Sequence, residues 1–151
     1  MKHVILCLSL LFLVACKTNN GDIGRYYGTW ALDAIEIDGQ TDTSWQEPGT
    51  WTNWSFQNNI IEIARVDDLQ DATKRYGTWK ELSDPDVLVL DFTHGDDETQ
   101  SGTDVYAAPE WVFIDAGITQ LSILHASDRN MTLRYTNSEG KTITYYLRKT
   151  Y

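Results

Sequence analysis

The sequence predicts an all-β domain folded as an antiparallel up-and-down barrel of eight strands. Two observations lead to this prediction. Short apolar-rich segments follow one another through most of the chain, and apolar and polar side chains alternate within them. Alternation of this kind is typical of antiparallel sheets that bury one face and expose the other to water. Closing such a sheet into a barrel leaves no unpaired edge strand.

Eight segments have the composition and length of strands. They are residues 30–37, 51–57, 60–66, 73–82, 87–93, 120–126, 131–136 and 142–149. Links such as Asn58-Asn59 and Asn137-Ser138-Glu139-Gly140 are rich in the residue types that form tight turns. A short helix is expected only near residues 67–72, so the fold class is all-β.

The alternation also predicts which side chains point into the barrel. Met131, Leu133 and Tyr135 lie on one face of their segment, and the polar residues between them lie on the other. The same separation recurs in residues 142–149 and, less cleanly, in residues 87–93. The interior face defined in this way is continuous and apolar, and it is expected to contain no charge.

Residues 1–15 are expected to be a signal peptide. The run from Val4 to Val14 is apolar except for Ser9, and it is shorter than the roughly 20 residues that span a bilayer. It ends in Leu13-Val14-Ala15-Cys16, which resembles the lipobox of bacterial lipoproteins. A cysteine thiolate is the nucleophile suited to forming a thioether with a lipid donor. Cys16 is therefore expected to be lipidated and to become the N-terminus.

The rest of the chain divides into a tether and one domain. Residues 16–25 are polar and include Asn19-Asn20-Gly21, which is typical of a flexible linker. Residues 26–151 are long enough for a single barrel domain with its own core. Cys7 would leave with the signal peptide and Cys16 would carry lipid. The folded domain is therefore expected to have no disulfide and no thiolate metal site.

The net charge excludes some partners. The chain has 12 Lys and Arg against 22 Asp and Glu, a net charge of −10. A domain this acidic repels phosphate backbones and anionic membrane surfaces. We therefore expect no nucleic-acid partner. Attachment to the membrane is expected to depend on the lipid of Cys16 alone, in the cell envelope and at the outer membrane, on a face that the sequence does not specify.

The tripeptide Gly-Thr-Trp occurs three times, at residues 28–30, 49–51 and 77–79. The spacings are unequal, so the copies do not form a solenoid repeat. Each copy lies at or just before the start of a segment with strand character. Glycine allows a tight turn, and the following tryptophan can cover an end of the core while its N–H stays near water.

The first copy, Gly28-Thr29-Trp30, resembles the Gly-x-Trp motif of the lipocalin and calycin superfamily. In that family the Trp closes the floor of the barrel against a basic residue near the last strand, and the matching position here is Arg148. The resemblance covers roughly residues 27–149, and it extends to the lipocalin-like lipoproteins of Bacteroidetes through further segments. These are Pro109-Glu110-Trp111, Leu121-Ser122-Ile123-Leu124, Met131-Thr132-Leu133-Arg134-Tyr135 and Ile143-Thr144-Tyr145-Tyr146-Leu147.

The resemblance implies a non-enzymatic binding protein for a small apolar or amphipathic ligand. Trp54 and Trp111 are expected nearest the mouth of the barrel. The ligand-lining residues are expected to be Trp54, Phe56, Ile61, Ile63, Leu90, Trp111, Ile123, Leu133 and Tyr145. No nucleophile elbow, phosphate loop or zinc-helix motif is present in the sequence, and the acidic cluster after His94 lacks the spacing of a calcium loop. Neither a catalytic residue nor a cofactor or metal is expected.

Two other functions remain open. A solid barrel could act through its surface as a protein-interaction module, such as an envelope assembly factor or an inhibitor. Outward-facing aromatic side chains could instead stack on sugar rings. A cavity of about 300 Å³ or more favours a ligand carrier, whereas an interior filled by side chains favours surface binding.

Overall fold

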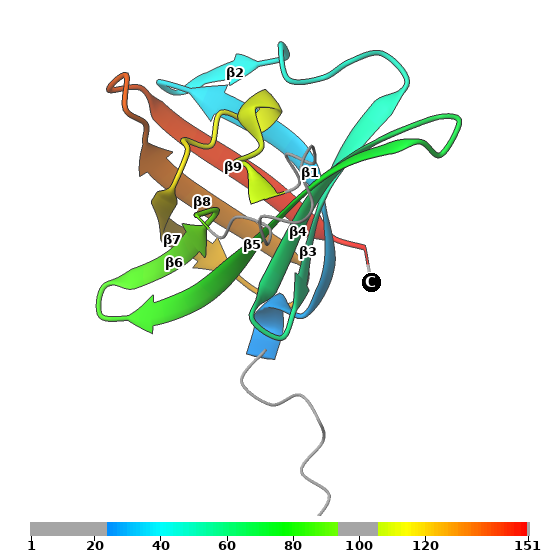
Figure 1. The fold of residues 1–151 in the computed structure, drawn as a ribbon. Helices are drawn as coiled ribbons and strands as arrows, with labels where there is room; N and C mark the ends of the chain where they lie inside the picture. The colour runs from blue at the N-terminus through cyan, green and yellow to red at the C-terminus, as the bar shows by residue number, and fades with distance from the viewer. Residues whose placement is uncertain (1–23, 94–105, 151) are drawn as a thin grey trace, which may run out of the picture.

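The computed structural model describes residues 24–93 and 106–150, and Figure 1 shows their arrangement. The described part of the chain consists of strands and two short 3-10 helices. In chain order these are η2 (Gly24–Tyr26), β1 (Gly28–Ile37), β2 (Gln40–Asp42), β3 (Thr50–Gln57), β4 (Ile60–Asp67), β5 (Ala72–Ser83), β6 (Asp86–Asp91), η4 (Glu110–Val112), β7 (Ile118–Ala126), β8 (Asn130–Thr136) and β9 (Thr142–Lys149).

The strands form a closed antiparallel barrel. From β3 to β9 each strand pairs with the next one along the chain, and β1 pairs with both β3 and β9. The short β2 only folds back on the end of β1 and lies outside this ring. The barrel therefore has eight strands in up-and-down order, as the sequence predicts.

Local sequence explains the hairpins. Asp38 and Gly39 both have positive φ, 52° and 79°, which a tight turn between antiparallel strands requires. The turn between β4 and β5 contradicts the short helix expected near residues 67–72. The Asp67 carboxylate accepts hydrogen bonds from the backbone N–H groups of Leu69 and Asp71, at 2.9 and 2.8 Å. A side chain that binds its own turn in this way competes with helix formation.

The alternation of side chains places the core inside the barrel. Met131 and Leu133 of β8 and Ile143, Tyr145 and Leu147 of β9 are all buried. Neighbouring side chains on these strands are mostly exposed or half-buried. One apolar cluster fills the interior from one end to the other. The sequence predicts this face correctly for both strands.

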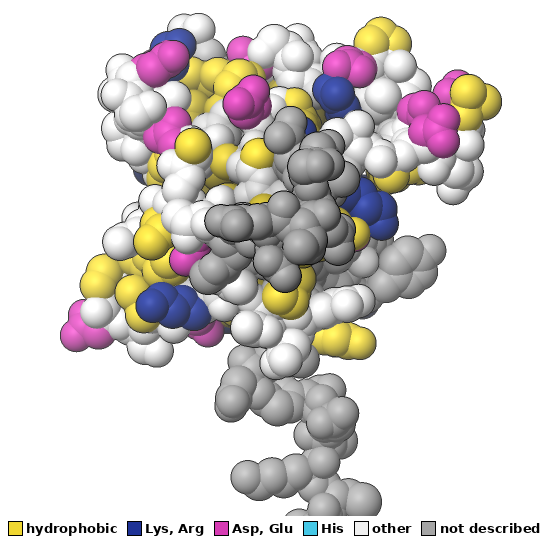
Figure 2. All heavy atoms as spheres, in the orientation of Figure 1, with side chains coloured by type: hydrophobic (Ala, Val, Ile, Leu, Met, Phe, Trp, Pro, Cys, Tyr) yellow, Lys and Arg dark blue, Asp and Glu magenta, His cyan; other side chains and the backbone are white. Residues whose placement is uncertain are grey.

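The barrel has two unlike ends. One end, called here the closed end, carries η2 and the β3–β4 and β7–β8 turns. The other, called here the open end, carries the β4–β5 and β8–β9 turns and η4. Figure 1 shows η2 and η4 at opposite ends of the molecule. Acidic side chains are spread around the η4 end in Figure 2.

The three Gly-Thr-Trp copies have different roles. Trp30 and Trp79 are buried, whereas Trp51 is 42% exposed on the outside of β3. Gly77 is required by close packing, because a Cβ there would lie 2.6 Å from the carbonyl oxygen of Asp91. Gly49 instead has φ of 77°, which favours glycine. The expectation that each Trp covers an end of the core therefore fails for the second copy.

Candidate functional site

Trp30 seals the closed end of the barrel and is 1% exposed. Its indole Nε1–H donates to the carbonyl oxygen of Tyr26 at 2.8 Å, which ties η2 to the ring. Lys149 Nζ lies 5.2 Å from the ring centroid, within the range of a cation–π contact. The same ammonium donates to the carbonyl oxygen of Arg25 at 3.1 Å. Through these contacts, the indole of Trp30 links η2, at the start of the barrel, to β9, its last strand.

The basic residue on Trp30 is Lys149 and not Arg148, the position that the sequence analysis matched to the family motif. Trp30 and Lys149 are direct partners in the β1–β9 ladder, and direct partners share a face of the sheet. Arg148 lies one residue earlier, so its side chain points to the opposite face. There its Nε and Nη2 donate to the Asp33 carboxylate at 3.0 and 3.1 Å.

The interior is packed with side chains. Of the nine residues predicted to line a ligand pocket, the majority are fully buried, at 0% exposure. These are Trp54, Phe56, Ile61, Ile63, Leu90, Leu133 and Tyr145. The rings of Trp54 and Tyr145 lie 5.2 Å apart between centroids, and so do those of Phe56 and Trp79. The structure therefore brings most of the predicted residues together as core, not as the wall of an open cavity.

Trp111 and Ile123 differ from the other seven. Both are half-buried and pack against the edge of the core. Ile123 lies beside a register irregularity in β7, and Trp111 lies in η4 at the open end. Of the two residues expected at the mouth, the structure places Trp111 there and Trp54 in the core.

The open end is closed by η4 and the residues after it. Val112 and Ile114 are buried in the core at 0% and 2% exposure. The hydroxyl of Tyr145 donates to the carbonyl oxygen of Val112 at 2.8 Å, and the hydroxyl of Tyr135 donates to the carbonyl oxygen of Phe113. Two barrel tyrosines therefore hold this plug, defined as residues 110–114, by its backbone.

Burial governs the pKa values of these tyrosines. Burial raises the pKa of Tyr135 to about 12, with a further rise from the nearby Asp115 carboxylate. Burial also holds the pKa of Tyr145 well above its usual value of 10. Both hydroxyls therefore stay protonated at neutral pH and remain donors to the plug.

We expect the raised pKa of Tyr135 to make the fold sensitive to alkali. Because the pKa of Tyr135 is higher in the folded chain than in the unfolded chain, the protonated hydroxyl contributes its full stabilisation below pH 10, the unfolded pKa. This stabilisation is lost as the pH rises from 10 toward 12. The free energy of unfolding should fall less between pH 9 and pH 11 in Tyr135→Phe than in the unmodified chain, by about 1 kcal/mol. Urea unfolding at the two pH values measures this, and equal losses would contradict it.

Trp111 lies against two arginines at the open end. The guanidinium carbons of Arg65 and Arg75 are 5.4 and 5.6 Å from the centroid of the indole ring. Arg65 forms an ion pair with the half-exposed carboxylate of Glu47. Arg75 donates from Nη1 to the carbonyl oxygen of Lys74 at 3.3 Å, and the described residues give it no carboxylate. Arg75 Nε and Trp111 Nε1 are buried and have no hydrogen-bond partner among the described residues.

Sequence reasoning missed both arginines. Ile63 is a direct partner of Arg75 in the β4–β5 ladder and is fully buried, so Arg75 points into the barrel. Arg65 follows Ile63 by two residues and shares its face. The alternation that identified Ile61 and Ile63 as interior residues was therefore sufficient to find both arginines. The interior face carries charge at its open end, contrary to the expectation that it has none.

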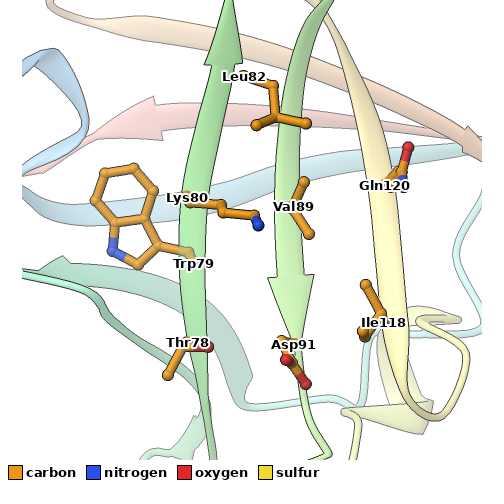
Figure 3. Close-up of a pocket in the computed structure, with 8 residues that line it drawn as sticks. All are labelled: Thr78, Trp79, Lys80, Leu82, Val89, Asp91, Ile118 and Gln120. Atoms are coloured by element: carbon orange, nitrogen blue, oxygen red, sulfur yellow. The ribbon is translucent and has the colours of Figure 1, made fainter.

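A second feature lies on the outside of the barrel. A groove of about 320 Å³ runs over β5, β6 and β7, and Figure 3 shows the side chains that line it. Val89, at its centre, is only 6% exposed although it points away from the interior. Ile118 is 60% exposed and Leu82 is 39% exposed. The less clean separation of faces in residues 87–93 agrees with this groove, because Val87 and Val89 lie on the face opposite Leu88 and Leu90.

The described residues give little support for a metal site, a membrane-spanning helix or a sugar-binding surface. No group of three or more His, Cys, Asp or Glu within residues 24–93 and 106–150 could hold a metal ion. In the same ranges no helix has the length and apolar character needed to cross a membrane. The exposed aromatic residues Tyr27, just before β1, and Trp51, near the start of β3, lie at opposite ends of the barrel and form no common platform for a sugar. Cys16 and the acidic cluster after His94 lie outside the described residues.

Comparisons with known proteins agree with the barrel. The family described as "Lipocalin-like domain" matches residues 10–150. A solved structure of an uncharacterized protein from Bacteroides eggerthii is 17% identical, with a TM-score of 0.56 over 83% of this chain and 99% of that chain. A lipocalin-like protein from Bacteroides uniformis is 16% identical, with a TM-score of 0.54 over 84% of this chain and all of that chain. At such identities the likeness shows the fold alone. No curated protein matches the sequence.

Proposed function

Because the chain belongs to the family of lipocalin-like domains, we propose that it is a non-enzymatic binding protein for a small apolar or amphipathic molecule. Lipocalin-like folds typically bind small hydrophobic ligands. The observation that carries the proposal for this chain is the construction of the open end. Among the described residues, a three-residue 3-10 helix and its flanking residues cover the core there, and two tyrosine hydroxyls hold them.

The packed interior limits where a ligand can bind. A molecule that entered the core would have to displace fully buried rings such as Trp54 and Phe56, at a large cost in packing. A molecule at the open end needs only a movement of the plug or a place beside it. Trp111 lies there, half-buried, as an aromatic surface. We therefore place the ligand at the open end, with its apolar part against the plug and Trp111.

A neutral fluorescent probe tests this proposal. Phenylnaphthylamine should bind the chain expressed from Lys17, which contains every described strand, at about one molecule per chain. Trp111→Ala should weaken binding about tenfold, whereas Trp51→Ala removes an exposed indole from the outside of β3 and should leave binding unchanged. Absence of probe binding to the folded chain would contradict the proposal. Melting curves of each variant show that the chain is folded.

We also propose that the protein is anchored in the cell envelope, at the outer membrane, by a lipid on Cys16. The support is the sequence alone, in the form of an apolar run that ends in Leu13-Val14-Ala15-Cys16. The closed end, with η2 at its base, is where the domain meets the segment that leads back to Cys16. A tether that joins the domain at its closed end would leave the open end accessible to a ligand or a partner.

Cys16→Ala should release the protein from the membrane. Without a thiol there is no site for the thioether, so the variant should move from the detergent-extracted membrane fraction to the aqueous fraction. Fractionation and immunoblotting measure the change. Cys7→Ala is the matched control, because Cys7 lies within the proposed signal peptide. The anchor hypothesis fails if the Cys16 and Cys7 variants partition alike.

The second candidate function is a protein-interaction module, and both the packed interior and the outer groove over β5 to β7 favour it. An apolar surface that includes Val89 and Ile118 is unusual on the outside of a barrel, where alternation normally places polar residues. The two candidates respond to different variants. If Ile118→Ser abolishes probe binding and Trp111→Ala does not, the binding surface is the outer groove.

A further inference from the structure

The open end holds two cations in a protein that is otherwise strongly acidic. The net charge is −10, yet Arg65 and Arg75 both lie against the single ring of Trp111. Two like charges near one another raise the free energy of the fold unless an anion compensates them. Glu47 compensates Arg65. The described residues offer no carboxylate to Arg75.

Most of the unsatisfied hydrogen-bonding groups near this end are donors. Arg75 Nε, Trp111 Nε1 and, deeper in the core, Trp54 Nε1 are buried without a partner among the described residues. Thr119 Oγ1, near the start of β7, also lacks a partner there, and this hydroxyl can donate or accept. Trp54 pairs with Ile63, which pairs with Arg75, so these residues lie on one row across three strands. A buried N–H without an acceptor is costly. A group with acceptor oxygens and negative charge would accept hydrogen bonds from these N–H groups and would also compensate the charge of the arginines.

We propose that the ligand of the open end carries an acidic oxygen headgroup, a carboxylate or a phosphate, which binds Arg75 beside Trp111 while the tail packs against the plug. The proposal rests on the function proposed above, because it concerns the ligand of the same site. Arg75 is the principal donor, since its guanidinium has no carboxylate among the described residues. Arg65 contributes to headgroup binding only to the extent that its ion pair with Glu47 is broken. The matching class of ligand is a single-chain amphiphile with an anionic head.

Three chain-matched probes test the headgroup. Dodecanoate, dodecyl phosphate and dodecanol share one tail and differ in charge, and each is titrated by calorimetry below its micelle concentration into the chain expressed from Lys17. The two anions should bind at least tenfold more tightly than the alcohol, which is the range of a charge-assisted hydrogen bond. The tighter of the two anions identifies the headgroup as carboxylate or phosphate. Added salt should weaken the anions more than the alcohol.

Two variants of opposite effect and one matched control complete the test. Arg75→Gln keeps hydrogen-bonding capacity but removes the charge, and it should abolish the preference for the anions. Arg129→Gln makes the same change at an exposed turn at the closed end and should have no effect. Glu47→Gln frees Arg65 and should strengthen anion binding severalfold, a gain that damage to the fold cannot produce.

The outcomes separate this inference from the proposed function. If the alcohol and both anions bind equally and Arg75→Gln changes nothing, the site binds apolar molecules and the headgroup inference is overturned. If Arg129→Gln weakens the anions as much as Arg75→Gln does, only the overall charge matters, and the inference is again overturned. If phenylnaphthylamine binds the folded chain and none of the three dodecyl probes does, the headgroup inference is overturned. If phenylnaphthylamine also fails to bind, the proposed function itself fails.

Discussion

Replacing Trp30 with Ala is expected to lower the free energy of unfolding by about 3–5 kcal/mol, the usual cost of deleting a large buried aromatic side chain. The indole is 1% exposed, donates to the carbonyl oxygen of Tyr26 and lies under the ammonium of Lys149. Urea unfolding followed by circular dichroism measures the loss. Trp51→Ala, at an exposed position, should cost less than 1 kcal/mol.

A double-mutant cycle decides which basic residue covers Trp30. Lys149→Ala and Trp30→Ala should be non-additive by about 0.5–1 kcal/mol, the size of a partly exposed cation–π contact. Arg148→Ala and Trp30→Ala should be additive, because the Arg148 guanidinium pairs with Asp33 on the opposite face. Coupling of Trp30 to Arg148 and none to Lys149 would contradict the register of β9.

Replacing Trp54 with Ala is also expected to cost about 3–5 kcal/mol. The side chain is fully buried and packs against Tyr145 at 5.2 Å between ring centroids. The cost should lie toward the lower end of the range, since the buried indole N–H has no partner within residues 24–93 and 106–150 and its removal relieves a penalty. Chemical unfolding measures it.

Trp111→Ala is the comparison for Trp54→Ala. Trp111 is only half-buried, at the open end, so its removal should lower the free energy of unfolding by no more than about 1.5 kcal/mol. A result in which Trp54→Ala leaves the fold unchanged while Trp111→Ala destabilises it strongly would show that the assignment of core and mouth is reversed.

Most of the fold follows from local sequence. The alternation in residues 131–136 and 142–149 predicts the buried face of β8 and β9, and turn residues such as Asn58-Asn59 predict the hairpins. These features depend on neighbouring residues only, so they can be predicted from a single sequence. The helix expected near residues 67–72 was wrong because a single side chain, Asp67, satisfies the backbone of the turn.

The candidate site could be predicted only in part. Trp111 was identified as a residue of the mouth, whereas Trp54 was not distinguishable from it, since both are aromatic residues in apolar surroundings. The difference is one of depth along the barrel, and strand register determines depth. The same register places Lys149, not Arg148, opposite Trp30. A family motif gives the approximate position of such a residue, but a shift of one residue reverses the face.

Arg65 and Arg75 illustrate a second limit of prediction from sequence. Their strand positions follow from the alternation, but charged side chains in strands are normally assigned to the solvent face. What brings Trp111 to both of them is η4, which is distant in sequence and lies over this end of β4 and β5. Contacts of this kind depend on the tertiary fold and cannot be derived from the periodicity of either strand.

The location of the ligand is the central claim, and the indole N–H signals of the tryptophans test it most directly. The chain has six Trp residues, and each gives one signal in a ¹H–¹⁵N spectrum of the labelled chain. During titration with dodecanoate, the signal of Trp111 should shift in proportion to occupancy, while those of Trp30 at the closed end and Trp51 on the outside should not move. A shift at Trp30 without one at Trp111, or no shift in any indole signal while calorimetry shows binding, would contradict a ligand site at the open end.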